Sequence, residues 1–119
     1  MRRRIWRAVF VVGVVALGTV AWLSLRQPPP VSVTVMNNSH KAVASATLVH
    51  EKGVETIGDI PVGQSRLVAF RTRGETSYSL NVRFEDGTEL TGGGNYAEPG
   101  YSFSESVSDS TITNQLEGM

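Results

Sequence analysis

Two glutamates and two tyrosines near the C-terminal end of the sequence are residues whose types could perform chemistry. Glu98 and Glu105 lie on either side of a Pro-Gly turn, and Tyr96 and Tyr101 accompany them. Two carboxylic acids can hydrolyse a glycosidic bond, but the distance between them decides whether they do. The sequence does not fix that distance, so a glycan-acting enzyme of the cell envelope remains one alternative.

The same stretch has the composition of a binding loop. Residues 92–101 combine glycines, tyrosines, an acidic side chain and a rigid Pro-Gly turn, a mixture that loops on β-scaffolds use to bind partners. We therefore predict a partner-binding loop that contains Asn95, Tyr96, Glu98 and Tyr101. In the alternative interpretation Tyr101 starts a strand and packs inward, which leaves Tyr96 as a single exposed ring.

The rest of the sequence offers no catalytic, metal or cofactor motif. His40 and His50 are ten residues apart and form no HxH or HExxH pattern, so we expect no metal site. The segment 63–65, Gly-Gln-Ser, lacks the second glycine of a nucleophile elbow. Three acidic residues lack the spacing of a calcium-binding loop: Glu85, Asp86 and Glu89. We predict no catalytic residue, no cofactor and no enzymatic activity.

Charge and cysteine content exclude several further classes. The formal charge of the 119 residues is zero, yet residues 31–117 carry six basic and eleven acidic residues, a net charge of −5. Such a domain is unsuited to nucleic acid, which requires a basic surface. The sequence has no cysteine, so disulfides, thiolate metal sites and the acylated cysteine of a lipoprotein are absent.

An apolar segment follows the arginine-rich start of the chain. Residues 8–25 are uncharged and would form about 27 Å of helix, enough to span a membrane. Residues 1–7 hold four arginines and are expected in the cytoplasm, which places the rest of the chain outside, in a bacterial periplasm. We predict a single-pass signal-anchor helix in the inner membrane; cleavage near Ala21, with release to the periplasm, is the alternative.

The residues that must position the candidate loop form short strands. Residues 26–30, with three prolines, form a stiff linker to this domain. Alternating apolar and polar residues and the turns between them then predict seven or eight strands, the eighth being the short segment 111–113: 31–36, 44–51, 54–60, 65–72, 78–85, 88–91, 101–107 and 111–113. Asp86-Gly87 predicts a tight hairpin, and Gly92-Gly93-Gly94 predicts a flexible loop.

The predicted fold is all-β. Short strands at spacings of roughly ten residues indicate a small antiparallel β-sandwich over residues 31–117, with an immunoglobulin-like Greek key preferred and a small β-barrel as the alternative. The predicted function is a membrane-anchored periplasmic binding or scaffold module that works through a protein partner. An immunity or inhibitor protein, whose acidic surface would meet a basic toxin, is a narrower alternative.

Overall fold

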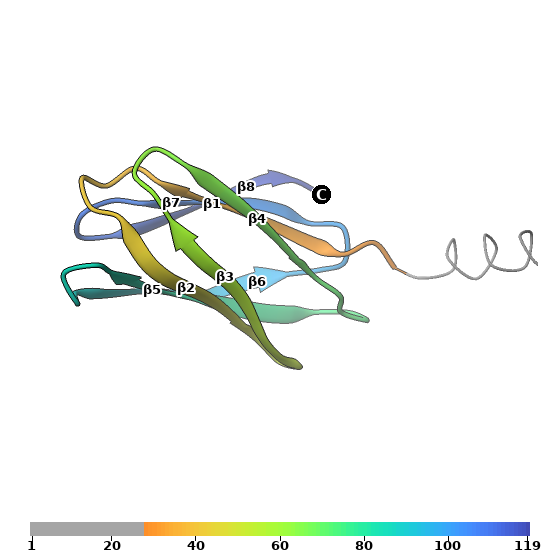
Figure 1. Cartoon of the computed structure of the whole chain (residues 1–119). Helices are drawn as coiled ribbons and strands as arrows, with labels where there is room; N and C mark the ends of the chain where they lie inside the picture. Colours follow the sequence, from red (N-terminus) through yellow and green to blue (C-terminus); the bar gives the residue numbers. More distant parts are fainter. Residues whose placement is uncertain (1–27) are drawn as a thin grey trace, which may run out of the picture.

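The protein is a sandwich of two four-stranded β-sheets (Figure 1). The computed structural model describes residues 28–119. The strands are β1 (Val31–Asn37), β2 (Val43–His50), β3 (Gly53–Ile60), β4 (Ser65–Phe70), β5 (Thr76–Phe84), β6 (Glu89–Ala97), β7 (Ser102–Val107) and β8 (Ile112–Gly118). One sheet has the order β4-β1-β7-β8 and the other β3-β2-β5-β6. Neighbouring strands are antiparallel except β1 and β7, which are parallel.

The expectations for the N-terminal part fall outside this description. The spanning segment 8–25, the cytoplasmic residues 1–7 and the cut near Ala21 all lie before residue 28. Among residues 28–119 no helix is long and apolar enough to cross a membrane.

The core follows the alternation that the sequence predicts. In β5 the side chains of Tyr78, Leu80, Val82 and Phe84 are buried, and in β1 every second residue from Val31 onward is buried too. These inward positions meet between the two sheets. Each large apolar side chain removed from water there stabilises the fold by about 1.5–3 kcal/mol.

The pairing of the strands differs from the immunoglobulin-like arrangement that we preferred. In an immunoglobulin constant-type domain the first strand shares a sheet with the second, fifth and fourth. Here β1 lies between β4 and β7, while β2 belongs to the opposite sheet. The small barrel is not observed either, because in residues 28–119 neither β3 and β4 nor β6 and β8 are joined by strand pairing. Alternation says which residues face the core, whereas pairing depends on long-range contacts.

A buried asparagine links the two sheets where the chain crosses after β1. Asn37 is fully buried at the end of β1, and its Nδ2 donates to the carbonyl oxygens of Lys41 at 2.8 Å and of Ile60 at 2.9 Å. Its Oδ1 accepts the backbone N–H of Ser39 at 3.0 Å. The amide therefore ties β1 to the end of β3 in the other sheet and fixes the crossing segment 38–42.

The glycine triplet is not the loop that we predicted. Residues 92–94 continue β6, which runs as far as Ala97. Gly94 has a φ of +72°, and the pairing with β5 shifts between Tyr78↔Asn95 and Leu80↔Gly92, so a β-bulge absorbs the extra residue. A Cβ on Gly92 would lie 3.1 Å from the Ile112 side chain of β8. Glycine permits the bulge at Gly94 and the close approach of the two sheets at Gly92. Residues 92–94 are part of a strand because β6 pairs with β5.

The remaining strands lie within about two residues of their predicted bounds, except the last. Asp86-Gly87 forms the hairpin between β5 and β6, where Gly87 has a φ of +87° and Asp86 Oδ1 accepts the backbone N–H of Thr88 at 2.9 Å. The last strand, expected over residues 111–113, runs from Ile112 to Gly118. It pairs with β7 and forms one edge of its sheet.

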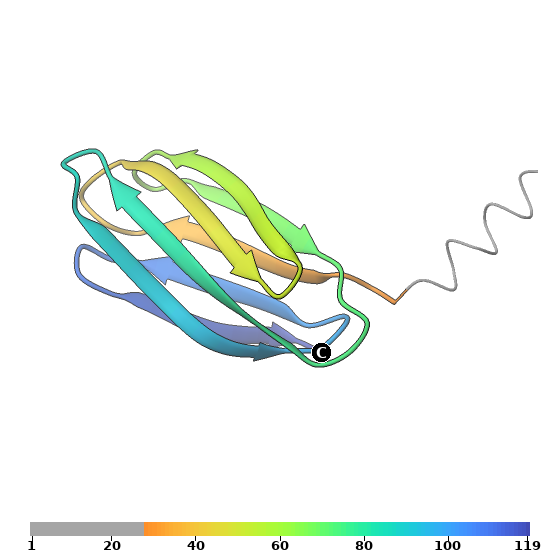
Figure 2. The same cartoon turned by 90° about the horizontal axis from the view of Figure 1, so that it is seen from below.

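The chain enters the sandwich at a defined end. Pro28 and Pro30 lie beside the connections 71–75 and 98–101, and the C-terminus lies at this end as well (Figures 1 and 2). The connections 38–42, 61–64, 85–88 and 108–111 lie at the opposite end. We call these the entry end and the far end.

Replacing Asn37 tests the link between the sheets. We expect Asn37→Ala to lower the free energy of unfolding by about 3 kcal/mol, because it leaves buried carbonyl groups without a donor. Urea denaturation followed by circular dichroism measures the change. Asn38→Ala is the matched control, since Asn38 is exposed, and it should cost less than about 1 kcal/mol. Equal losses in the two variants would contradict the role given to Asn37.

Candidate functional site

The predicted loop residues lie at the entry end, around the connection between β6 and β7. Tyr96 is near the end of β6, Glu98 lies in the connection, and Tyr101 comes directly before β7. The Tyr101 hydroxyl donates to Glu98 Oε2 at 2.8 Å, and the rings of Tyr96 and Tyr101 meet edge to face with centroids 6.3 Å apart. The structure thus brings these three residues together.

Asn95 does not share their surface. Its Nδ2 donates to Oε1 of the buried Glu105 at 3.0 Å, so its side chain reaches into the space between the sheets. This follows from the strand itself, because Asn95 and Tyr96 are consecutive in β6 and point to opposite faces. Asn95 supports the loop from inside, and Tyr96 is the member that a partner can reach.

The two loop tyrosines are neutral hydrogen-bond donors. Desolvation and the carboxylates of Glu75 and Glu98 raise the pKa of Tyr96 to about 12. The hydrogen bond to Glu98, followed by desolvation, raises the pKa of Tyr101. Tyr96 is 50% exposed, and Tyr101 is partly buried against Phe103, with ring centroids 6.0 Å apart. The alternative interpretation expected Tyr101 to pack inward and Tyr96 to be exposed alone. Tyr101 packs inward in part, and its ring also contacts Tyr96.

A row of aromatic rings connects this loop to the core. Consecutive ring centroids lie 4.5 to 6.3 Å apart along the series His50, Phe70, Tyr78, Phe103, Tyr101 and Tyr96. Aromatic pairs at such separations stabilise beyond the area that they bury. The rings come from both sheets, so the row packs the loop against the core of the sandwich.

The polar centre of the site is a buried glutamate that joins the sheets. Glu105 of β7 is 1% exposed, and its Oε1 accepts hydrogen bonds from the Tyr78 hydroxyl at 2.6 Å, Asn95 Nδ2 at 3.0 Å and Asn114 Nδ2 at 2.7 Å. Asn114 Nδ2 also lies 3.1 Å from the Tyr78 oxygen. We call these four side chains the Glu105 cluster. Desolvation, then the hydrogen bond to Glu105, raises the pKa of Tyr78, which keeps its proton on the hydroxyl.

Glu98 and Glu105, the two glutamates considered as a hydrolytic pair, lie in different environments. Glu105 is held inside the core, where its carboxylate accepts hydrogen bonds from protein donors. Glu98 lies in the loop and accepts from Tyr101. The arrangement supplies one accessible carboxylate and one internal carboxylate.

Sequence reasoning missed the cluster, although a signal was present. Glu105 stands at an inward position of β7, between Phe103 and Val107, where the alternation calls for an apolar residue. A charged residue at such a position requires partners. The partners come from β5, β6 and β8, and no spacing in the sequence connects these strands.

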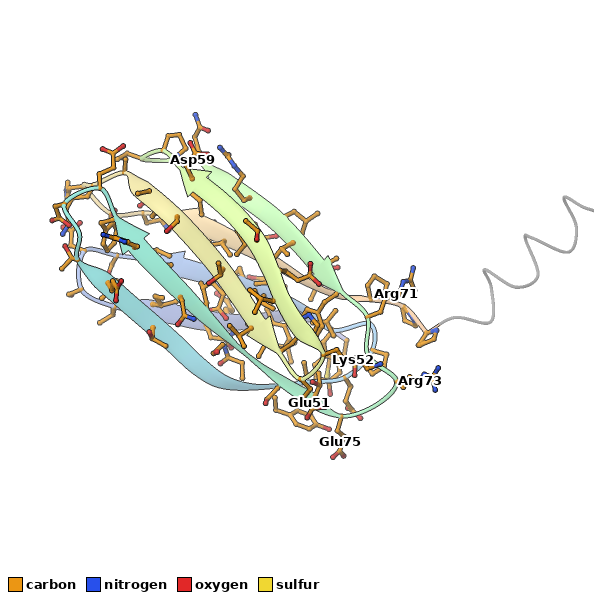
Figure 3. The ribbon with its side chains drawn as sticks, turned by 60° about the horizontal axis from the view of Figure 1, so that its bottom comes forward. Glu51, Lys52, Asp59, Arg71, Arg73 and Glu75 are labelled. Atoms are coloured by element: carbon orange, nitrogen blue, oxygen red, sulfur yellow. The ribbon has the colours of Figure 1, made fainter. Side chains whose placement is uncertain are left out.

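Charged side chains of both signs surround the entry end. Figure 3 shows Glu51, Lys52, Arg71, Arg73 and Glu75 projecting there, whereas Asp59 lies at the other end. Arg71 Nη1 donates to the carbonyl oxygen of Pro28 at 2.9 Å, so one of these charges holds the incoming chain. Across the part of the chain that the structure describes, no three His, Cys, Asp or Glu residues are grouped so as to hold a metal ion.

Comparisons with known proteins support the fold. No family model and no curated protein sequence matches the chain. A solved structure, the NMR structure of a protein from Eubacterium rectale, superposes with a TM-score of 0.54 and 11% sequence identity over 73% of this chain and 87% of that chain. At this identity the likeness concerns the backbone arrangement alone.

Substitutions at Glu105 test whether its carboxylate holds the cluster together. We expect Glu105→Met to lower the free energy of unfolding by about 3 kcal/mol, because buried donors from β5 and β6 lose their acceptor. Glu105→Gln retains an acceptor oxygen and should lose less than half as much. Urea denaturation measures both variants. A Glu105→Met protein as stable as the wild type would show that the hydrogen bonds contribute no net stability.

Proposed function

We propose that this protein is a membrane-anchored, extracytoplasmic binding module without enzymatic activity, and that it contacts a protein partner through the entry-end loop. The observation that carries the proposal is the position of Tyr96, half exposed, beside Glu98 and against the ring of Tyr101. Tyrosine suits such a surface because its ring provides a large contact area at little cost in conformational entropy. The ring row behind the loop reduces that cost further.

The chain geometry supports a partner at the membrane surface. If residues 8–25 span the bilayer, only residues 26–28 separate the span from the point where Arg71 holds the Pro28 carbonyl. Three extended residues reach about 10 Å. Gly100 N also donates to the Pro30 carbonyl at 3.3 Å, so the loop and the linker are in direct contact. The entry end would then face the headgroups, within reach of an integral membrane protein.

The commitment of Glu105 to the core supports binding over glycan hydrolysis. A hydrolytic pair requires two carboxyl groups that reach the substrate. Of Glu98 and Glu105, only Glu98 lies in the loop, where it accepts a hydrogen bond from the Tyr101 hydroxyl. The acidic balance of the domain, six basic against eleven acidic residues, keeps an immunity or inhibitor role toward a basic partner as the second candidate.

Reporter fusions test the proposed membrane topology. Alkaline phosphatase fused after Glu117 should be active in a bacterial host, because the domain is exported, and membrane fractions should retain the fusion after a salt wash. A cytoplasmic reporter such as green fluorescent protein at the same position is the control and should remain dark. Phosphatase activity confined to the soluble periplasm would favour cleavage near Ala21 over retention.

Site-specific crosslinking tests the contact surface. A photoreactive amino acid at Tyr96 of the full-length protein, in native membranes, should capture a membrane-protein partner. The same group at Val62, which is 52% exposed at the far end, is the matched control and should not. We further expect Tyr96→Ala to weaken the association at least tenfold, as removal of an aromatic anchor does. Capture from Val62 alone would overturn the proposed surface.

A further inference from the structure

A series of shallow hollows lies along the outer face of the β3-β2-β5-β6 sheet and shares only Tyr96 with the loop just described. We call this series the groove. It consists of three neighbouring hollows of about 380, 300 and 270 Å³. The first has Asn81 and Arg83 of β5 in its lining, the second has Ser77 and Ser79, and the third has Ser77 again together with Tyr96. The hollows therefore follow the outward-facing residues of β5, over about 20 Å of strand.

Small residues create this groove. Ser79 of β5 lies beside the bulge formed by Gly93 and Gly94 of β6, and a Cβ on Gly93 would lie 3.4 Å from that of Ser79. Ser77 lies opposite Tyr96. The β6 glycines that form the bulge thus leave the middle of the sheet face uncovered. Tyr96 stands at one end of the groove, and Arg83 and Glu89, opposite each other in the strand register, stand at the other end.

Half of the residues that line the hollow of about 380 Å³ carry uncharged hydrogen-bonding groups. Thr47 of β2 lies opposite Asn81 of β5, which in turn lies opposite Thr91 of β6. Ser45 lies opposite Arg83 in the same lining. The Thr91 hydroxyl donates to Asn81 Oδ1 at 3.1 Å, which orients that amide. Side chains of this kind can exchange hydrogen bonds with the hydroxyl groups of a ligand.

The strand pairing argues against an extended peptide in this groove. Peptides that bind sheets usually add to an exposed edge, where the backbone groups have no partner. The groove lies over β2 and β5, which are each paired with neighbours on both sides. A polyanion is also disfavoured, because Glu51 and Glu75 line the groove and the domain carries a net charge of −5.

We propose that this groove binds an extended, neutral glycan chain. The sugar hydroxyls exchange hydrogen bonds with Asn81 and the neighbouring serines and threonines, and the apolar face of one sugar ring stacks on Tyr96. This second surface goes beyond the proposed protein-binding function, since only Tyr96 is common to both. A module that contacts a membrane partner at the entry end can then hold a glycan along its side.

Calorimetric titration with a hexamer of β-1,4-linked N-acetylglucosamine tests this proposal. The full-length protein is used in a zwitterionic detergent, because detergents with sugar headgroups would compete. We expect saturable binding that Ser79→Trp, which fills the middle of the groove, weakens at least tenfold. Ser102→Trp, on the outer face of the other sheet, is the matched control and should bind as the wild type does.

Asn81→Ala keeps the test valid if a tryptophan at position 79 disturbs folding. This exposed truncation should weaken hexamer binding three- to tenfold, with the circular dichroism spectrum unchanged. Absence of hexamer binding at millimolar concentration, or equal weakening by Ser79→Trp and Ser102→Trp, would overturn the glycan assignment. So would groove-dependent binding of a neutral extended peptide in place of the hexamer. Crosslinking from Tyr96 should persist in Ser79→Trp, so failure of one surface is distinguishable from failure of the other.

Discussion

The hydrogen bond between the Tyr78 hydroxyl and the Glu105 carboxylate is the interaction on which the described surfaces depend. It joins β5 of one sheet to β7 of the other at 2.6 Å, and Asn95 and Asn114 add β6 and β8 to the same oxygen. A buried carboxylate is costly unless donors replace its water. Here three side-chain donors replace the water around Glu105, and their hydrogen bonds form a joint between the two sheets. The loop that carries Tyr96 begins and ends on strands held by this joint.

Two buried polar side chains join the sheets in different ways. In the middle of the sandwich Glu105 accepts hydrogen bonds from donors on β5, β6 and β8. At the far end the neutral amide of Asn37 donates to backbone carbonyl groups of the crossing segment and of β3. Among the described residues, no buried side-chain nitrogen or oxygen lacks a hydrogen-bond partner. Full satisfaction is what allows a disulfide-free domain to hold polar groups inside its core.

The glycines of β6 show how a single sequence feature can act on both faces of a sheet. On the inner face the absence of a side chain at Gly92 lets Ile112 of β8 approach, and on the outer face Gly93 and Gly94 leave the groove open. The bulge in the same stretch sets the phase of the strand that follows, so that Asn95 turns inward and Tyr96 outward. The loop and the groove therefore share one structural cause.

The sequence by itself determined the β character, the inward residues of β1 and β5 and the Asp86-Gly87 hairpin, because alternation and turn chemistry are local properties. It also brought Tyr96, Glu98 and Tyr101 to one connection, since they are close in the chain. Only the tertiary structure decided the sheet order, the strand through the glycines and the place of Glu105, because each depends on partners far apart in sequence. A glutamate at an inward position indicates that hydrogen-bond donors must lie nearby. The tertiary structure identifies Tyr78 and Asn114 among these donors.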